Sequence, residues 1–477
     1  MKILKKYDLL IIGCGASGFA AAIKASELTE GKIKIGMVCK GLLGGTCVNV
    51  GCVPSKYLIE ITNKYYLSRK KFIGLELSAK INFTDIMGGL KKVVKELREE
   101  KYEKVLNYYS NVDLIKGDVT FIEPNKIRVN TEKGEQELSG SKIIIGVGSR
   151  PAIPPIQGLQ NVGYITSDTV WDLKELPHSL LVIGGGAIGL EIGQALARLG
   201  SEVTVVEVMD RILPSPYFEP EISYALTDYL EDEGLNIYTK STVTMVSKEG
   251  DTKVVEISTK RGKQRLEVDE ILVATGRRPN TENLELEKAG ITTDQKGYIL
   301  VDKFLQTSNP IVYAAGDCIA KSLMLETLAA KEGVLAATNA IKGNIETIDY
   351  STTPIVVFTD PQVASVGLTE DELMKREKVC SCRILKLDYV AKARLIGDTR
   401  GFVKLVVNPK DGTVVGVHIL SPLASEIIME GVMLVKNKVK LEELVETTHV
   451  FPTISESIKL AAQSFIRDPS KMSCCVE

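Results

Sequence analysis

The sequence predicts an α/β fold with two Rossmann-like dinucleotide-binding domains, followed by a C-terminal α+β domain. Two observations predict the first part. A short apolar strand runs into a Gly-x-Gly-x-x-Gly loop and then a helix near residue 13, and the same order returns near residue 184. A third observation predicts the last domain, because strand-like runs alternate with helices from residue 351 to about residue 465.

Length and composition agree with a multidomain globular protein. The 477 residues are too many for one hydrophobic core and predict two to four domains. The formal net charge of −2 gives no reason to expect nucleic acid or an anionic membrane as a partner. No apolar run approaches the roughly 18 residues of a membrane span. Asp8 and the glycines that follow it argue against a signal peptide, so we expect a cytoplasmic protein.

The first fingerprint follows a predicted strand at residues 7–12. Its glycines are Gly13, Gly15 and Gly18, which let backbone amides and the positive end of the next helix approach a pyrophosphate. The next strand, residues 33–38, should end in an acid that holds a ribose. Cys39 stands there instead, which weakens that expected contact and leaves the pyrophosphate site intact.

Residues 44–56 contain Cys47 and Cys52, five positions apart, in a run with three glycines and a proline. In a regular helix such residues rise about 7.5 Å and point apart. The pair can therefore form a disulfide only if Cys47 lies in the glycine-rich entry to a helix and Cys52 on its first turns. There a pair could cycle between disulfide and thiolate, because a helix N-terminus lowers a thiol pKa. The spacing alone leaves two ordinary buried cysteines or a structural bridge equally open.

Further along, residues 82–109 predict an amphipathic helix whose apolar stripe packs in a core.

The second fingerprint follows a strand at residues 180–183 and has Gly184, Gly186 and Gly189, opening a helix that runs to about residue 199. Glu207 ends the next strand, residues 203–206, about 20 residues beyond the fingerprint. A carboxylate there accepts hydrogen bonds from a ribose 2′-hydroxyl and repels a 2′-phosphate, which favours NADH over NADPH. An ordinary solvated strand end is the alternative.

Residues 44–56 resemble the active-site signature of the pyridine nucleotide-disulfide oxidoreductases over their whole length. The resemblance implies that Cys47 exchanges with substrate, that Cys52 contacts the flavin of FAD as a thiolate, and that Lys56 lies near the flavin and pairs with Glu191. Three later segments carry the same resemblance: residues 143–151 with Gly148, residues 271–279 with Gly276, and residues 311–317 with Gly316 and Asp317. In that family the third segment binds the ribityl chain of FAD.

The resemblance also implies a homodimer and a division of the chain. The expected parts are residues 1–150 and 278–350 for the FAD domain, 151–277 for the NAD(P)H domain, 351–465 for the dimerisation domain, and 466–477 for a flexible tail.

A histidine that disulfide-reducing members carry directly before a proline is replaced here by Phe451. His449 lies two residues earlier and points elsewhere if the segment is extended. We expect His178 and His418 to be structural, so the acid that protonates a leaving thiol is missing. A lipoamide or glutathione substrate is therefore not expected.

The tail carries Cys474 and Cys475 side by side. With Phe451, this pair resembles the mercuric reductases of the family, in which the partner subunit's tail delivers Hg(II). The sequence departs from that group in three ways. Many members have tyrosine at the position of Phe451, and some have tyrosine at the position of Ala187. The sequence also shows no N-terminal domain with a Cys-x-x-Cys motif.

The expected reaction is reduction of Hg(II), delivered by small thiols, to Hg(0), with metal ligands Cys47, Cys52, Cys474 and Cys475. Two alternatives remain: an NADH-dependent disulfide reductase such as dihydrolipoamide dehydrogenase, and a thiol protein that binds metal or senses redox state without turnover. Cys14, Cys39 and Cys318 stand alone and are expected to be small buried hydrophobes, while Cys380 and Cys382 receive no role.

Overall fold

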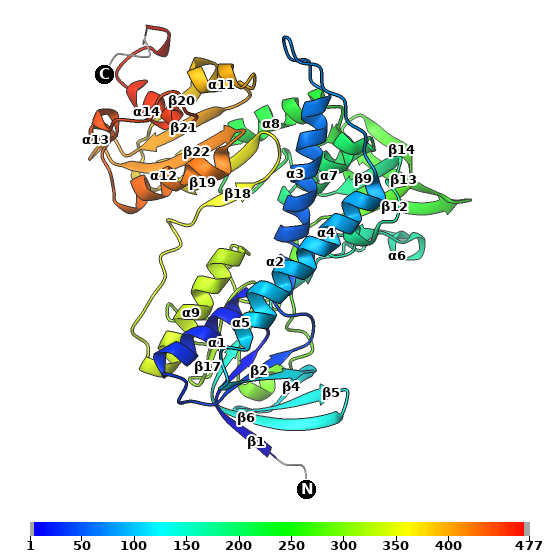
Figure 1. Cartoon of the computed structure of the whole chain (residues 1–477), viewed down its shortest axis with the longest axis vertical. Helices are drawn as coiled ribbons and strands as arrows, with labels where there is room; N and C mark the ends of the chain where they lie inside the picture. Colours follow the sequence, from blue (N-terminus) through cyan, green and yellow to red (C-terminus); the bar gives the residue numbers. More distant parts are fainter. Residues whose placement is uncertain (1–3, 472–477) are drawn as a thin grey trace.

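The computed structural model describes residues 4–471 and arranges them as three bodies around a central pair of long helices (Figure 1). The first body is built on a seven-stranded sheet whose order is β3-β2-β1-β6-β5-β4, with β17 added beside β6. β1, β2, β3, β6 and β17 run parallel, whereas β5 and β4 continue the sheet as an antiparallel extension. The strands are β1 (Leu4–Ile12), β2 (Ile35–Cys39), β3 (Val112–Lys116), β4 (Asp118–Glu123), β5 (Lys126–Thr131), β6 (Gly134–Ile145) and β17 (Val312–Ala314).

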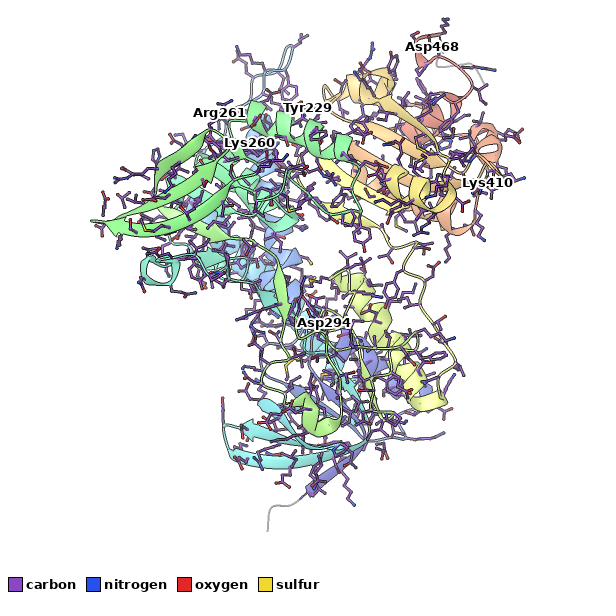
Figure 2. The ribbon with its side chains drawn as sticks, turned by 180° about the vertical axis from the view of Figure 1, so that it is seen from behind. Tyr229, Lys260, Arg261, Asp294, Lys410 and Asp468 are labelled. Carbon is purple, nitrogen blue, oxygen red and sulfur yellow. A yellow bond between two sulfur atoms is a disulfide. The ribbon has the colours of Figure 1, made fainter. Side chains whose placement is uncertain are left out.

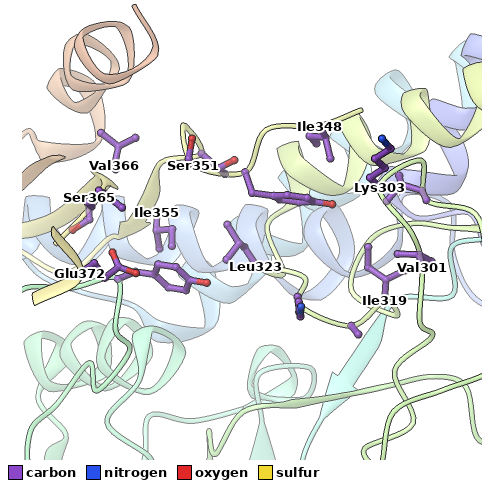
Figure 3. Close-up of a pocket in the computed structure, with 18 of the residues that line it drawn as sticks. Val301, Lys303, Ile319, Leu323, Ile348, Ser351, Ile355, Ser365, Val366 and Glu372 are labelled. Carbon is purple, nitrogen blue, oxygen red and sulfur yellow. The ribbon is translucent and has the colours of Figure 1, made fainter. Parts of the chain in front are cut away.

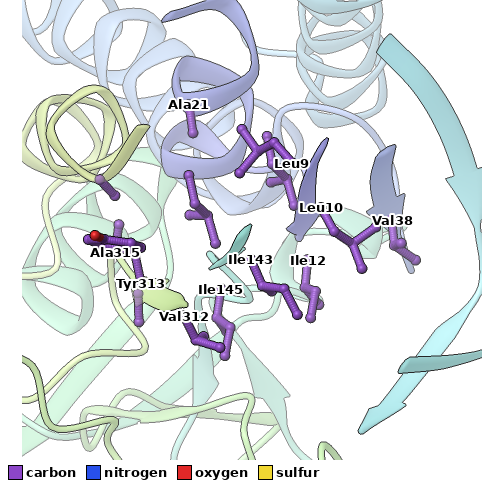
Figure 4. Close-up of a cluster of buried hydrophobic side chains, with 14 of the residues drawn as sticks. Leu9, Leu10, Ile12, Ala21, Val38, Ile143, Ile145, Val312, Tyr313 and Ala315 are labelled. Carbon is purple, nitrogen blue, oxygen red and sulfur yellow. The ribbon is translucent and has the colours of Figure 1, made fainter. Parts of the chain in front are cut away.

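The core of this body lies between the parallel strands and two helices. Figure 4 shows Leu9 and Ile12 of β1, Ile143 and Ile145 of β6 and Val312 of β17 converging, all at most 2% exposed. Because both faces of a parallel sheet are covered, its strands are continuous apolar runs, which is why residues 7–12 could be recognised from the sequence. Two helices, α1 (Ala16–Leu28) and α9 (Glu326–Lys342), pack side by side against this sheet.

The two long central helices connect the first body to the second. The predicted helix over residues 82–109 is confirmed in outline: Asn82 caps it by accepting a hydrogen bond from the Asp85 backbone N–H at 3.3 Å, and Leu90 and Val94 of its apolar stripe are buried. It is interrupted by a π-helical turn. The elements here are α2 (Gly45–Val50), α3 (Cys52–Ser68), α4 (Phe83–Arg98), the π turn Glu99–Glu103 and α5 (Lys104–Leu106).

The second body repeats the nucleotide-binding topology. Its parallel sheet has the order β11-β10-β9-β15-β8, and a separate antiparallel sheet has the order β12-β13-β14. The predicted strands at residues 180–183 and 203–206 and the helix ending at Leu199 are confirmed. The elements are α6 (Leu159–Val162), β8 (Ile165–Thr166), β9 (Ser179–Ile183), α7 (Ala187–Leu199), β10 (Glu202–Val206), α8 (Pro220–Asp232), β11 (Asn236–Tyr238), β12 (Thr242–Glu249), β13 (Thr252–Thr259), β14 (Gly262–Val268) and β15 (Glu270–Val273).

The chain enters and leaves the second body through two adjacent short strands. β7 (Ser149–Pro151) and β16 (Arg277–Pro279) pair antiparallel, with Arg278 opposite Arg150. These are the ends of two of the segments on which the family resemblance rests. Their pairing places the entry and exit of the chain next to each other, so the second body is inserted between β6 and β17 of the first.

The third body is an antiparallel sheet of order β18-β19-β22-β21-β20 with helices on it. Tyr229 of α8 lies beside it (Figure 2), and its hydroxyl accepts a hydrogen bond from the Gly401 backbone N–H at 3.1 Å. The elements are β18 (Ile355–Val357), β19 (Gln362–Gly367), α10 (Glu370–Glu377), β20 (Ser381–Lys386), α11 (Ala391–Leu395), β21 (Phe402–Val407), β22 (Val414–Ser421), α12 (Ala424–Lys436), α13 (Leu441–Glu446) and α14 (Glu456–Gln463).

A buried ion network joins the second and third bodies. Arg198 of α7, 3% exposed, contacts Glu233 at 2.6 Å and Asp360 at 2.8 Å, and Arg400 contacts the same two carboxylates at 2.9 Å each. Two guanidinium groups shared between two carboxylates satisfy charges that would be costly to bury singly.

In the part of the chain that the structure describes, no helix combines the length and the apolar character needed to span a bilayer.

Candidate functional site

The two cysteines of residues 44–56 lie in two consecutive helices. Cys47 belongs to the short α2, Cys52 is the first residue of α3, and Gly51 separates the helices. A Cβ atom at Gly51 would lie 3.2 Å from the Cys47 Cα and 2.9 Å from the Thr46 carbonyl oxygen, so this close approach requires glycine. The break brings together two thiols that a continuous helix would hold apart.

The structure holds Cys47 and Cys52 as free thiols in hydrogen-bond contact. The Cys47 thiol donates to the Cys52 sulfur, which raises the pKa of Cys47, and burial raises it further. The same hydrogen bond lowers the pKa of Cys52, and the positive charge of Lys56 adds to this. The position of Cys52 at the N-terminus of a 17-residue helix acts in the same direction. These effects favour Cys52 over Cys47 as the thiolate of the pair.

Lys56 is held by a buried acid from the second body. Its ammonium group lies 2.7 Å from Glu191 of α7, whose side chain is 7% exposed. The other oxygen of Glu191 accepts a hydrogen bond from the Phe358 backbone N–H at 2.9 Å, and Lys56 lies 4.5 Å from the centre of the Phe358 ring. α3 packs along α7, which explains why residues so far apart in sequence meet here (Figure 1). A fixed ammonium group therefore faces the thiol pair.

These groups share one cavity of about 280 Å³. Its lining combines the first fingerprint, the cysteine loop, Lys56 with Glu191, and the segments around residues 148 and 317. Among the predicted site residues it includes Gly15, Cys47, Cys52, Lys56, Gly148, Glu191, Gly316 and Asp317. Asp317 accepts a hydrogen bond from the Ser149 hydroxyl at 2.7 Å and lies 4.0 Å from the Arg277 guanidinium. Five segments between residues 15 and 317 are thus assembled at one place.

The two glycine fingerprints form equivalent turns. Gly13 has φ +116° and Gly184 has φ +110°. A Cβ atom would lie 2.1 Å from the Gly146 carbonyl oxygen in the first case and 2.4 Å from the Ala274 carbonyl oxygen in the second. No side chain caps the N-terminus of α1 or of α7. The first backbone N–H groups of both helices are therefore not occupied by a capping side chain at these turns. The residues present therefore fit two nucleotide pyrophosphates.

Of the other predicted site residues, Gly18 and Gly189 provide close helix–strand contact at their turns, and Gly276 begins the return to the first body. Glu207 is 5% exposed and accepts hydrogen bonds from the backbone N–H groups of Gly185 and Met209, each at 2.7 Å. Its carboxylate therefore lies against the second fingerprint loop, not in solvent. Cys474 and Cys475 lie outside the described residues.

The expectation for Cys14 and Cys39 is partly wrong. Both are buried, as expected, but they do not stand alone: the structure joins them in a disulfide with a Cα–Cα distance of 5.3 Å. Cys14 lies two residues after the end of β1 and Cys39 ends β2, and the carboxyl ends of neighbouring parallel strands meet at the same sheet edge. Cys318 is fully buried as expected, and burial raises its pKa to about 12.

None of the three histidines is among the residues that line the dithiol cavity in the described chain. His449 contacts Glu430 of α12 at 2.7 Å, which raises its pKa, while Phe451 is 51% exposed. His418 is fully buried, and burial lowers its pKa. His178 is exposed near Glu202. His178 and His418, which we expected to be structural, lie outside the lining of this cavity.

Sequence reasoning missed Tyr102 and Glu326. Tyr102, assigned to a packing helix, stacks edge-on against Phe19 with ring centres 5.0 Å apart. Burial raises its pKa to about 12, with smaller contributions from Glu326 and the two cysteines. Glu326 begins α9 and lines the cavity. The only signal in the sequence for these two residues near the thiol pair was Tyr102 itself, which stands eight residues after Val94 of the apolar stripe.

A second cavity of about 640 Å³ lies between the first and third bodies (Figure 3). Figure 3 shows Lys303, Leu323 and Ile348 on one side and Ile355 and Ser365 on the other. Its described lining contains neither cysteine nor histidine. Redox chemistry is therefore assigned to the smaller cavity, which holds the thiol pair.

Comparison with known proteins identifies the class to which this fold and site belong. The sequence profile of the pyridine nucleotide-disulphide oxidoreductases matches residues 7–340, and the profile of their dimerisation domain matches residues 353–462. The chain belongs to this family. Membership implies an enzyme that uses FAD and a nicotinamide cofactor, and the dimerisation domain supports a homodimer.

Within the family, mercuric reductases are among the curated relatives that match this chain. The chain is 40% identical over 471 residues to that of Lysinibacillus sphaericus and 39% identical over 474 residues to that of Staphylococcus aureus, in each case across 98% of this chain and 84% of the relative. A mercuric reductase of Streptomyces lividans is 37% identical across 98% of both chains.

Solved structures with the same fold include other members of the family. The Cu(II) complex of the HOCl-induced flavoprotein disulfide reductase RclA from Escherichia coli has a TM-score of 0.86 at 28% identity, covering 97% of this chain and 100% of that one. LpdA from Mycobacterium tuberculosis has the same TM-score at 27% identity and the same coverage. The likeness spans all three bodies, so the arrangement of the nucleotide folds and the third body is that of the family.

Proposed function

We propose that the chain reduces Hg(II) to Hg(0) with electrons from a nicotinamide cofactor, and that Cys47 and Cys52 ligate the metal. The observation that carries this proposal is a thiol pair beside a fixed ammonium group, in a chain that has Phe451 where the disulfide-reducing members of the family have a histidine. Hg(II) is a soft ion that prefers thiolate ligands. Its reduction needs two electrons and releases thiolates, so no acid has to protonate a product. The similarity to mercuric reductases supports the same reaction.

Cys47, the cysteine to which the family resemblance assigns exchange with substrate, passes its proton to Cys52 and attacks a thiol-ligated Hg(II), displacing one of the ion's two thiolates. Cys52 then passes this proton to the displaced thiolate and becomes the second protein ligand, displacing the remaining thiolate. The ion ends on two cysteine sulfurs, and one small thiol and one small thiolate leave. Lys56, held by Glu191, keeps positive charge beside Cys52 while this exchange occurs.

We assign the cofactors to the two fingerprints. FAD and a nicotinamide nucleotide, when bound, supply the electron pair that the metal accepts. Gly13, Gly15, Gly18, Gly148, Gly316 and Asp317 would hold FAD, with Lys56 beside it. Gly184, Gly186, Gly189, Glu207 and Gly276 would hold the nicotinamide nucleotide. The cradles at Gly13 and Gly184 support this assignment, because a side chain there would collide with the opposite backbone.

The proposal also includes the five predicted parts of the chain with the residue boundaries given above. It includes a cytoplasmic location and delivery of Hg(II) as a complex with small thiols.

One assay separates the candidate reactions. We expect the holoenzyme to oxidise NADH when thiol-ligated Hg(II) is added, with release of Hg(0) measured in the headspace. Lipoamide and glutathione disulfide, supplied as matched alternative substrates, should give little NADH oxidation. Comparable turnover with lipoamide would instead support a disulfide reductase. Stoichiometric Hg(II) binding without NADH oxidation would support a metal-binding protein without turnover.

The nicotinamide cofactor is expected to be NADH. A 2′-phosphate would lie next to the buried carboxylate of Glu207, whereas a 2′-hydroxyl can donate to it. We expect kcat/KM for NADH to exceed that for NADPH by at least about tenfold, or about 1.4 kcal/mol. Glu207→Gln should reduce this ratio, because glutamine keeps an acceptor and removes the charge. Equal or higher kcat/KM for NADPH in the wild-type enzyme would show that Glu207 does not select the cofactor.

A further inference from the structure

Cys380 and Cys382 lie at the start of β20 in the third body, away from the dithiol cavity. Cys380 directly precedes the strand, and Cys382 pairs with Val406 of β21. Side chains two apart on a strand share a face, and so do residues directly opposite each other on paired strands. Because Ile384 lies opposite Lys404, the Lys404 side chain is on the same face of the sheet as Cys382.

Lys404 holds the carboxylate of Glu370, which lies beside these two cysteines. Its side chain is 2% exposed, and its ammonium group contacts Glu219 at 3.0 Å, Glu221 at 2.9 Å and Glu370 at 2.8 Å. Glu370 is the first residue of α10 and is half-buried. A carboxylate has two oxygens and about four lone-pair sites, so the contact with Lys404 does not use up its capacity to bind a metal ion.

The ligand atoms of Glu370, Cys380 and Cys382 all lie within 4.8 Å of one another. The two sulfurs are bonded to each other in the structure, so this proximity describes the oxidised pair. After reduction, an ion with thiolate bonds of about 2.3 Å can bind both sulfurs if they lie no more than about 4.6 Å apart. A donor set with two thiolates and one carboxylate favours soft or borderline ions such as Hg(II), Cd(II) or Zn(II) over Mg²⁺ or Ca²⁺, which prefer oxygen. All three residues are absent from the lining of the dithiol cavity.

We propose that Glu370, Cys380 and Cys382 form a second binding site, for a thiophilic divalent metal ion, separate from the redox centre. The proposal goes beyond the proposed function and does not rest on it. The structure joins Cys380 and Cys382 in a disulfide, with a Cα–Cα distance of 6.2 Å. The site therefore has a closed, oxidised form and an open, reduced form, and only the open form provides two thiolates.

The two forms interconvert by thiol–disulfide exchange. Two small thiols reduce the bridge, leave as their own disulfide and transfer two protons to Cys380 and Cys382. The metal ion then displaces these two protons and binds both sulfurs and the Glu370 carboxylate. Reduced small thiols therefore open the site, and the bound ion protects it from closing again.

The test uses the full-length holoenzyme with its other redox-pair thiols removed as Cys47→Ser, Cys52→Ser, Cys474→Ser and Cys475→Ser. After reduction and anaerobic desalting, Cd(II) is titrated as the probe, and bound metal per chain is measured by mass spectrometry after gel filtration. We expect about one tightly bound Cd(II) per chain, and its loss when Cys380→Ser and Cys382→Ser are added. Glu370→Gln should weaken the affinity roughly tenfold or more. Omitting the reduction step should also abolish binding.

Two matched variants serve as controls. Glu377→Gln lies on the same helix as Glu370, and Cys318→Ala removes a buried thiol of the first body. In that four-serine background, both should keep the Cd(II) stoichiometry of the background protein, and circular dichroism and flavin content should be unchanged in every variant compared. Cys380→Ala alone provides a second test of the thiol ligands if the double serine variant does not fold. Unchanged Cd(II) binding without Cys380 and Cys382, or no binding to the reduced background protein, would overturn the proposal.

Discussion

Replacing Cys52 with alanine is expected to lower turnover of Hg(II) by at least about 10³-fold, because the variant loses the only group of the pair that is a thiolate before metal arrives. The hydrogen bond from Cys47 and the charge of Lys56 hold the pKa of Cys52 below its ordinary value. No other described cysteine lines this cavity besides Cys47, whose raised pKa keeps it protonated. The long-wavelength thiolate–flavin absorbance of the reduced holoenzyme should disappear with the turnover.

Two comparison variants separate this role from simple damage. Cys318→Ala, in the first body, should retain both the absorbance band and turnover, since Cys318 is fully buried and lines neither cavity in the described chain. Cys47→Ala removes the hydrogen bond that lowers the pKa of Cys52, so the band should survive and titrate with a midpoint at higher pH than in the wild type. A long-wavelength band of full intensity in Cys52→Ala would contradict the thiolate assignment.

The fold could be predicted to a large extent because its signals are local. A buried parallel strand is a continuous apolar run, and a nucleotide turn needs glycine where a Cβ atom would meet a backbone oxygen, as at Gly13 and Gly184. Both features lie within some twenty residues, and the structure has both where the sequence predicts them. The π-helical turn at Glu99–Glu103 has no such signal, since its residues are also good α-helix formers.

The thiol pair could be predicted from one short segment, but its surroundings could not. Tyr102 and Glu326 approach it from helices 55 and 279 residues further along the chain. Cys14 and Cys39 meet because β1 and β2 are neighbours in the sheet, and Glu370 at the start of α10 comes close to Cys382 of β20 in the third body. Spacing in the sequence contains no information on such contacts between elements. They depend on strand order and helix packing.

The last expected result concerns Cys474 and Cys475, which lie beyond the described residues. An ion held by two thiolates leaves slowly unless a further thiolate attacks it, so delivery to Cys47 and Cys52 needs an exchanging ligand. Asp468 lies at the outer end of the third body (Figure 2), and the resemblance of the Cys474–Cys475 tail to that of mercuric reductases implies delivery to the partner subunit. We therefore expect the pair to serve the partner subunit's site in the homodimer.

The variant Cys474→Ala/Cys475→Ala should slow turnover of thiol-ligated Hg(II) by at least about tenfold, or about 1.4 kcal/mol on the barrier, while reduction of the bound flavin by NADH keeps its wild-type rate. Ser473→Ala, next to the pair, is the matched control and should change neither rate. Mixed dimers with one chain lacking the tail pair and the other lacking Cys52 should keep at most one working site, built from the intact tail of one chain and the intact dithiol of its partner. Full Hg(II) turnover in the double-alanine enzyme with excess small thiol would rule out delivery by the tail. Slower flavin reduction in that enzyme would instead make the tail a structural element, because metal delivery does not enter the reaction of NADH with the flavin.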